Sequence, residues 1–255
     1  MKNRQETSIC YLDLKKAFDT VNHDLLLVKL ERYGIRGNAL ELLRDYLSNR
    51  YQYVEIDGEQ SSLEKINYGV PQGSVLGPLL FLIYINDLPI ACKNTKAVLF
   101  ADDISIISSD KWNSQRNLQN SVNEVSSWLT QNKLTLNLDK TNVCNFNGKT
   151  VSCRFGSRKL KQIKSSKYLG LKIDAKLKFK DHIDYVCKKL IKYCAIFYRI
   201  RKIFHRKHLL QFYNAFVKTK IQYGFLVYDC CKDASLQPIF MLQKRIIETI
   251  FSKRK

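Results

Sequence analysis

Two adjacent aspartates between apolar segments are the feature that most restricts what this chain can fold into. The apolar residues 98–101 lead directly into Asp102 and Asp103, and isoleucines recur through 104–107. Apolar runs on both sides of a short polar turn predict a β-hairpin. Two like charges at its tip repel each other, which is costly unless a cation lies nearby. The sequence therefore predicts a hairpin with a cation-binding tip.

A second acidic patch lies about ninety residues earlier, where Asp13 and Asp19 flank Leu-Lys-Lys-Ala-Phe after a strand-like segment at 8–14. A few carboxylates and substrate phosphates together hold hard ions such as Mg²⁺, and two such ions can clamp an in-line phosphoryl displacement. Each patch alone also fits a solvated strand end or an aspartate-stabilised turn. Together they support a hypothesis of nucleotidyl transfer.

The composition indicates a globular protein. With 255 residues and 45% hydrophobic content, the chain can bury a sizeable core in one large or two small domains. It has no apolar run of 18 residues and no charged-then-apolar leader, so we expect no membrane partner and no secretion. An intracellular location, in the nucleus, the cytoplasm or both, follows. The eight cysteines form no CxxC pair, which argues against zinc and favours reduced, mostly buried thiols.

The charge is distributed unevenly along the chain. Residues 1–150 contain 17 basic and 17 acidic side chains, whereas residues 151–255 contain 26 basic and 6 acidic ones and carry the whole net charge of +20. A neutral part with the acidic patches and a strongly basic part together predict chemistry joined to a polyanion-binding surface. Nucleic acid is the expected polyanion.

Apolar periodicity and turn residues predict the order of elements. A strand at 8–14 is followed by two helices, a hairpin, a glycine-proline loop, an apolar helix and the aspartate hairpin. A long helix, short strands and a helical C-terminal part come next. The expected ranges of these later elements are, for the helices, 22–34, 38–48, 79–85, 114–131, 181–204, 206–220 and 239–251, and, for the strands and hairpins, 50–68, 142–147 and 151–173. We expect a domain boundary near residue 175.

This succession resembles the palm of reverse transcriptases, most closely the non-LTR, LINE or jockey-like retrotransposon enzymes. The resemblance implies an α+β fold: a right-hand polymerase palm, with an antiparallel sheet packed on helices, over 1–174 with remnant fingers, then a basic, mainly helical thumb-like region over 175–255. It covers nearly the whole chain.

The segment 12–19 resembles the first palm motif of the family, in which the leading aspartate is a metal ligand. That implies the role for Asp13. Phe18 stands where the family keeps an aromatic beneath the sugar, and a ring there would disfavour a ribose 2′-hydroxyl. A core phenylalanine is the alternative. Asp19 and His23 are interpreted as local caps rather than ligands.

The loop and helix start at 69–81, Gly-Val-Pro-Gln-Gly-Ser-Val-Leu-Gly-Pro-Leu-Leu-Phe, resemble the second palm motif and are the most specific match. The resemblance implies that Gln72 and Gly73 line the pocket for the incoming nucleotide and template base. Glycine allows close approach of a ligand to the backbone. The alternative is a glycine-proline turn before a buried helix.

Phe-Ala-Asp-Asp at 100–103 resembles the third motif, which implies that Asp102 is the second main metal ligand and Asp103 its companion. The segment 136–141 resembles the fourth motif, so Lys140 would lie near the leaving pyrophosphate as a general acid or charge stabiliser. A surface lysine is the alternative. Tyr168, Leu169 and Gly170 resemble the last palm motif, a hairpin that holds the primer terminus.

The implied function is RNA-directed DNA polymerisation with two Mg²⁺ ions, or Mn²⁺, acting on an RNA template, a DNA primer and dNTPs. The thumb would follow the duplex backbone without reading bases. Its candidate contacts are basic, with a solvated helix face as the alternative interpretation, and comprise Lys188, Lys189, Lys192, Arg199, Arg201 and Lys202.

The sequence departs from the family pattern ahead of Asp13, where only twelve residues stand and the fingers segment is expected to be missing. We therefore also consider a truncated, catalytically inactive retroelement relic that at most binds nucleic acid. A maturase-like role in RNA splicing is a third hypothesis. Oligomeric state does not follow from the sequence.

Overall fold

The chain consists of two compact units. The structure is a computed structural model that describes residues 5–231 and 233–252. The sheet unit comprises residues 1–145 and 149–163, and the helical unit comprises residues 146–148 and 164–255. The division between them falls at residue 163, earlier than the boundary expected near residue 175. Each unit is described separately below.

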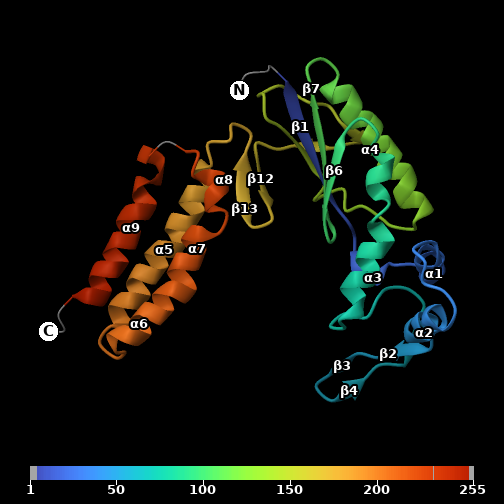
Figure 1. Cartoon of the computed structure of the whole chain (residues 1–255), viewed down its shortest axis with the longest axis horizontal. Coiled ribbons are helices and arrows are strands. Elements are labelled where there is room, and N and C mark those ends of the chain that lie inside the picture. Colours follow the sequence, from blue (N-terminus) through green and yellow to red (C-terminus); the bar gives the residue numbers. More distant parts are fainter. Residues whose placement is uncertain (1–4, 232, 253–255) are drawn as a thin grey trace. The chain divides into compact units, whose positions relative to one another are not determined.

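A five-stranded sheet forms the centre of the sheet unit, with the strand order β11-β8-β1-β7-β6 (Figure 1). Strand β1 lies between β7 and β8 and is antiparallel to both, whereas the short β11 joins β8 in parallel. The strands are β1 (Glu6–Asp13), β6 (Lys96–Phe100), β7 (Asp103–Asp110), β8 (Asn142–Asn145) and β11 (Lys161–Gln162). The strands predicted at 8–14 and 142–147 and the aspartate hairpin are therefore confirmed.

Helix α4 (Ser114–Gln131) packs against β1 and β7, and Leu118, Val122 and Val125 on it are buried (Figure 1). These positions recur at helical spacing, which is why this segment forms an amphipathic helix. The other helices of the unit are η1 (Ala17–Asp19), α1 (His23–Arg32), α2 (Asn38–Leu47), α3 (Leu76–Ile85) and η2 (Leu88–Ala91). Of these, α1, α2 and α3 confirm the helices predicted at 22–34, 38–48 and 79–85.

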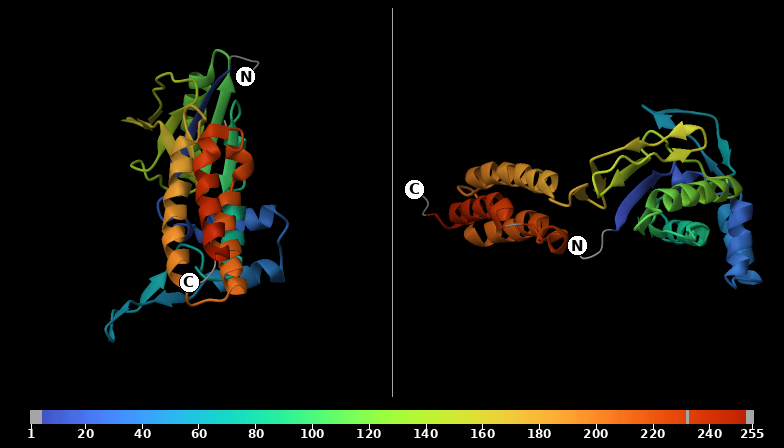
Figure 2. Two further views of the ribbon diagram at one scale, coloured as in Figure 1. Left: turned by 90° about the vertical axis from the view of Figure 1, so that its left-hand side faces the viewer. Right: turned by 90° about the horizontal axis from the view of Figure 1, so that it is seen from above.

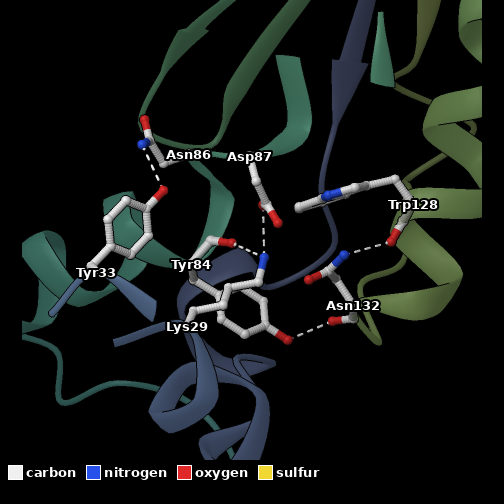
Figure 3. Close-up of polar contacts among 7 residues, drawn as sticks. All are labelled: Lys29, Tyr33, Tyr84, Asn86, Asp87, Trp128 and Asn132. Carbon is white, nitrogen blue, oxygen red and sulfur yellow. Dashed lines mark hydrogen bonds and ion pairs between the residues drawn. The ribbon is translucent and has the colours of Figure 1, made fainter. Parts of the chain in front are cut away.

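Lys29 joins three helices of the sheet unit (Figure 3). Its Nζ donates to the backbone oxygen of Tyr84 at 2.6 Å and to Oδ1 of Asp87 at 2.7 Å, and it lies 4.8 Å from the ring centre of Trp128. Tyr84 Oη donates to the Asn132 oxygen at 2.6 Å. Burial lowers the pKa of Lys29, against the opposing effect of Asp87. A cation enclosed by rings and a carboxylate therefore ties α1 to α3 and α4.

The hairpin predicted over 50–68 is present, but it is divided into two short ladders. Strands β2 (Arg50–Gln52) and β5 (Glu64–Ile66) form its base, and β3 (Glu55–Ile56) and β4 (Glu59–Gln60) form its tip. Asp57, in the turn, has a left-handed φ of 52°. The predicted Asp-Gly turn is therefore confirmed, and such turns need positive φ. Two further strands, β9 (Arg154–Phe155) and β10 (Arg158–Lys159), form a separate pair.

In the helical unit, α5 (Lys180–Ile200) and α9 (Asp233–Phe251) pack side by side, with α6 alongside α9 (Figure 2). Their buried apolar residues form a core separate from that of the sheet unit. A hairpin precedes the helices. The remaining elements are β12 (Ser165–Tyr168), β13 (Leu171–Asp174), α6 (Arg206–Phe212), the π-helix η3 (Tyr213–Lys218), α7 (Thr219–Gln222) and α8 (Phe225–Tyr228).

Two helix predictions for this unit need correction. The single helix expected over 206–220 changes to π-helical geometry at Tyr213 and returns to an α-helix at Thr219. The last helix begins at Asp233, so Pro238 lies inside it rather than before it. Pro238 lacks the N–H that would bond to the Ala234 carbonyl, so the second turn of this helix is without that hydrogen bond.

All eight cysteines are free thiols. Cys10, Cys92, Cys144 and Cys153 are buried, whereas Cys230 is exposed. Within residues 5–231 and 233–252, none of the helices combines the length and apolar character that crossing a membrane requires.

Candidate active site

The two acidic patches meet at one end of the central sheet. Asp13 is the last residue of β1 and Asp103 the first of β7, and the two are direct partners in the antiparallel register. Directly opposite residues project from the same face of a sheet. Asp102 occupies the turn between β6 and β7, where Phe100 pairs with Asp103. The pairing of β1 with β7 thus brings together aspartates that are ninety residues apart in the chain.

Negative charge is concentrated at this end of the sheet. The pKa of Asp103 is raised, first by burial and then by the charges of Asp102 and Asp13. Lys140 is the nearby cation, with its Nζ 4.0 Å from Oδ2 of Asp13. Among the described residues, no group of three or more His, Cys, Asp or Glu side chains is arranged to enclose a metal ion. Carboxylate repulsion is therefore only partly offset by this chain's own groups.

The turn at the aspartates is strained. Ala101 has a left-handed φ of 50°, a conformation that costs a residue with a Cβ about 1–2 kcal/mol. The strain follows from the two-residue connection between Phe100 and Asp103, because tight hairpin turns of this kind use positive φ. Strained turns of this type cluster at functional sites.

The segment 135–141 runs along the end of β1 and positions Lys140. Asn137 N donates to the Asp13 oxygen at 2.7 Å, Lys15 N donates to the Thr135 oxygen at 2.8 Å, and Asp13 N donates to Thr141 Oγ1 at 3.3 Å. These bonds fix the backbone on both sides of Lys140. Its ammonium therefore faces Asp13, and the side chain is 70% exposed.

Phe18 lies five residues after Asp13, in η1, and is partly buried. Its ring centre is 4.5 Å from that of Phe81 on α3, and its backbone oxygen accepts from Val70 N at 2.8 Å. The ring therefore packs on the core and also borders the loop at 69–75. Both interpretations of Phe18 remain compatible with this position.

The loop at 69–75 is joined to the segment after β1 by further hydrogen bonds. His23 Nε2 lies 2.7 Å from the Gly69 oxygen, and Gln72 Nε2 donates to Oδ1 of Asp19 at 2.7 Å. The interpretation of Asp19 and His23 as caps is wrong. Asn22 caps α1, because its Oδ1 accepts from Leu25 N, and this leaves the other two side chains to hold the loop.

Two glycines in this loop serve different purposes. Gly69 has a φ of 87°, and a Cβ there would lie 2.8 Å from the Asp19 oxygen, so close packing requires glycine. Gly73 has a φ of 84°, but a Cβ there would meet no atom within 4 Å. The left-handed backbone conformation, rather than crowding by neighbouring atoms, therefore explains why a glycine stands at position 73. The space beside it is open.

The residues Tyr168, Leu169 and Gly170 form the predicted hairpin, and it belongs to the helical unit. Leu169 and Gly170 have φ values of 44° and 82°, as a two-residue turn of type I′ requires. A Cβ on Gly170 would lie 2.9 Å from the ring of Tyr223, whose hydroxyl donates to the Leu169 oxygen. The hairpin tip is therefore fixed by the helical part of its own unit.

The six basic residues expected to bind nucleic acid divide into two groups. Lys188, Lys192 and Arg199 are exposed and share one face of α5, because they stand at positions i, i+4 and i+11. Lys202 is exposed just beyond that helix. Lys189 instead lies 5.8 Å from the ring centre of Tyr185.

Arg201 belongs with Lys189 among the side chains that contact this protein's own groups. Its guanidinium lies 4.7 Å from the ring centre of Tyr198, and Nη1 donates to Ser252 Oγ at 2.8 Å. Within the described residues, none of the four exposed cations, Lys188, Lys192, Arg199 and Lys202, forms an ion pair.

Sequence reasoning gave no role to Lys29, Asp87 and Asn132, which join helices of the sheet unit, or to Thr141, whose hydroxyl accepts from Asp13 N. Their partners are remote in the chain, and no local pattern marks them. Lys29 offered one weak signal, since it stands between the buried Leu26 and Leu30 on an otherwise amphipathic helix.

The chain belongs to the reverse transcriptase (RNA-dependent DNA polymerase) family, whose model matches residues 1–173. That match includes both acidic patches, the glycine-proline loop, Lys140 and the hairpin at 168–170. The expected α+β class, with largely antiparallel sheets, is confirmed.

Its relatives include polymerases of mobile elements, as the resemblance to non-LTR enzymes predicted. The RNA-directed DNA polymerase from mobile element jockey of Drosophila melanogaster is 27% identical over 268 residues, covering 98% of this chain and 29% of that protein. The probable RNA-directed DNA polymerase from transposon BS of the same fly is 28% identical over 277 residues, covering 97% and 29%. The chain thus spans about 29% of the length of these relatives.

Solved structures share the fold. Telomerase from Candida albicans, in complex with a fragment of telomeric RNA, superposes with a TM-score of 0.57 at 15% identity, covering 98% of this chain and 48% of that one. Apo telomerase from Candida tropicalis gives a TM-score of 0.51 at 14% identity, covering 96% and 41%.

Proposed function

We propose that this chain is the polymerising part of an RNA-directed DNA polymerase that adds dNTPs to a primer 3′-hydroxyl on an RNA template. The observation that carries the proposal is the pairing of Asp13 with Asp103 beside Asp102, at the end of a sheet whose residues match the reverse transcriptase family. The sheet unit would act as palm and the helical unit as thumb.

The donor set fits divalent ions. Mg²⁺ sites commonly use one or two carboxylates and take their remaining ligands from water and substrate phosphates, so a closed protein cage is not needed. Burial and, after it, the charges of Asp102 and Asp13 raise the pKa of Asp103, and a cation would relieve the repulsion among these carboxylates. Asp13, Asp102 and Asp103 would hold two Mg²⁺ ions, or Mn²⁺. Bound there, the ions would activate the primer hydroxyl and offset charge on the pyrophosphate.

The chain's own groups would position the reactants. Lys140, 4.0 Å from Asp13, can hold a proton for the leaving pyrophosphate or stabilise its charge. Phe18 would exclude a ribose 2′-hydroxyl, and Gln72 and Gly73 would border the nucleotide. One amide N–H of Gln72 donates to Asp19, so a nucleotide would use the second N–H or Oε1 of this amide.

In the helical unit, the hairpin tip at 168–170 would support the primer terminus. Lys188, Lys192, Arg199 and Lys202 would contact phosphates, since they are exposed and lack ion-pair partners within the described part of the chain. Lys189 and Arg201 would contribute only indirectly to phosphate binding, because both already contact aromatic rings of this chain.

Primer extension on an RNA template, with dNTPs and Mg²⁺, tests the proposal. Replacing Asp102 with asparagine should lower incorporation about 100- to 1,000-fold, because it removes charge where the transition state needs it. Asp45→Asn is the matched control, since Asp45 is exposed on α2, and it should leave incorporation unchanged.

Incorporation that does not depend on Asp102, or none at all in the unaltered chain alongside salt-sensitive nucleic-acid binding, would contradict the proposal. The second result would instead describe an inactive relic that binds nucleic acid.

A further inference from the structure

A cavity of about 610 Å³ lies between α5 and α9 in the helical unit. Half of its lining residues are apolar, and this part of the lining, here named the floor, consists of Ile191, Cys194, Ala195 and Leu242. The volume is within the range of about 300–1,000 Å³ that small-molecule sites occupy. No motif or family resemblance in this chain assigns it a ligand.

Cations and an aromatic ring border this groove. Arg199 on α5 and Arg245 on α9 line it, and neither forms an ion pair within residues 5–231 and 233–252. Tyr198 also lines it and is 59% exposed. Because Arg201 stacks on the Tyr198 ring and is itself bonded to Ser252, the ring is held in place without closing the groove.

The groove adjoins the exposed basic face of α5. Ala195 stands between Lys192 and Arg199 on that face, so one residue of the stripe also forms the groove floor. With a rise of about 1.5 Å per residue, Lys188 and Arg199 are about 16 Å apart along the helix. A row of phosphates lying on the stripe would therefore run past the mouth of the groove.

We infer that this groove accepts an unpaired base of a single-stranded nucleic-acid segment whose phosphates lie on the stripe of Lys188, Lys192 and Arg199. Single strands bind proteins through such a combination of a cationic track and aromatic surfaces for bases. A duplex would offer only phosphates, and an apolar floor would gain nothing from them. This inference deepens the proposed nucleic-acid role of the helical unit and rests on it.

Fluorescence anisotropy with three probes tests the inference: an oligothymidylate, an abasic DNA strand of the same length, and a duplex of that length. The full chain should bind oligothymidylate at least about fivefold more tightly than the abasic strand, because one stacked base contributes that much. Equal affinities, or tighter binding of the duplex, would overturn the inference.

Ala195→Trp should fill the groove and abolish the preference for bases, while affinity for the abasic strand stays the same. Ala215→Trp is the matched control, because Ala215 is an exposed helical alanine outside the groove, and it should keep the preference. Tyr198→Leu offers a second variant that removes the ring and keeps the floor apolar. A preference that survives both Ala195→Trp and Tyr198→Leu would overturn the inference.

Two further measurements separate the alternatives. Self-association of the chain that Ala195→Trp abolishes would identify the groove as a contact between copies and overturn the inference. Asp102→Asn should leave the base preference unchanged, because that residue belongs to the sheet unit. Equal affinity of the unaltered chain for oligothymidylate and the abasic strand, with intact primer extension, would thus disprove the inference and leave the polymerase proposal standing.

Discussion

The sheet unit and the helical unit place their functional groups in different ways. In the sheet unit, Asp13 and Asp103 meet only because β1 pairs with β7, and the loop at 69–75 is held by side chains from the segment after β1. In the helical unit, Lys188, Lys192 and Arg199 share a face because of helical spacing alone. One arrangement depends on long-range pairing and the other on local periodicity. The two units should therefore respond differently to substitution.

The largest effect is expected at Lys29, which is confined to the sheet unit. Lys29→Ala removes the partner of Asp87 and a cation next to two rings, so it should lower the free energy of unfolding of that unit by about 2–3 kcal/mol. Hydrogen exchange should show faster opening of α1, α3 and α4, and unchanged opening of α5 and α9.

Arg32→Ala is the matched control, because Arg32 is an exposed cation at the end of the same helix, and it should change stability little. Equal destabilisation by both variants would contradict a specific stabilising role of the Lys29 contacts.

The second test concerns the exposed cations of the helical unit. Replacing Lys188 and Lys192 with glutamine should reduce the salt dependence of nucleic-acid affinity by about two units of slope, since each phosphate contact contributes about 0.9. Lys189→Gln should leave the slope unchanged, because that ammonium lies over Tyr185. If Lys189→Gln lowers the slope as much as each of the other two substitutions does, the contact with Tyr185 does not keep Lys189 from binding phosphate.

The third test is a pH dependence specific to the helical unit. His182 is 2% exposed, and burial together with the charge of Lys172 lowers its pKa. The folded unit therefore favours neutral imidazole, so this contribution is complete above the unfolded pKa of about 6.5 and is lost as the pH falls through the lower folded value.

For one histidine, the slope of unfolding free energy between the folded pKa and the unfolded pKa of about 6.5 should not exceed about 1.4 kcal/mol per pH unit. Thermal unfolding of the helical unit between neutral and mildly acidic pH measures it. His182→Gln should flatten the slope, whereas substitution of the exposed His208 should retain it. Flattening by both variants would contradict the assignment to His182.

The smallest effect is expected at the strained turn of the sheet unit. Ala101→Gly removes a left-handed alanine, and the greater freedom of the unfolded chain partly offsets this gain, so unfolding free energy should rise by at most about 1 kcal/mol. Ala97→Gly, in the extended strand β6, should lower it by about 0.5–1 kcal/mol. Chemical denaturation compares the two, and changes of the same sign would contradict the strain at Ala101.

Local patterns explain what could be predicted from the sequence. The leucines at 25–30 and the apolar spacing of 114–131 fix α1 and α4, and Asp57-Gly58 fixes the turn of its hairpin. The capping roles predicted for Asp19 and His23 failed because distant partners decided the outcome. Asp19 bonds to Gln72 and His23 to Gly69, across about fifty residues, and this overrode their local tendency to cap a helix.

Contacts between distant parts of the chain also limit how much of the candidate site the sequence could predict. Family resemblance named Asp13, Asp102 and Asp103, but only the register of β1 and β7 places Asp103 opposite Asp13. The six basic candidates looked equivalent in the sequence. The contacts of Lys189 and Arg201 with aromatic rings depend on side-chain rotamers, which the sequence does not show. Arg201 is also held by Ser252, fifty-one residues away in the chain.

The central position of β1 has a consequence for synthesis of the chain. Its neighbours β7 and β8 begin at Asp103 and Asn142, so the first strand leaves the ribosome long before either partner exists. At about 5–20 residues per second, β1 remains unpaired for several seconds. During that interval its backbone hydrogen-bonding groups are open to other chains. Production of this protein should therefore benefit from chaperones that cover a nascent β-strand.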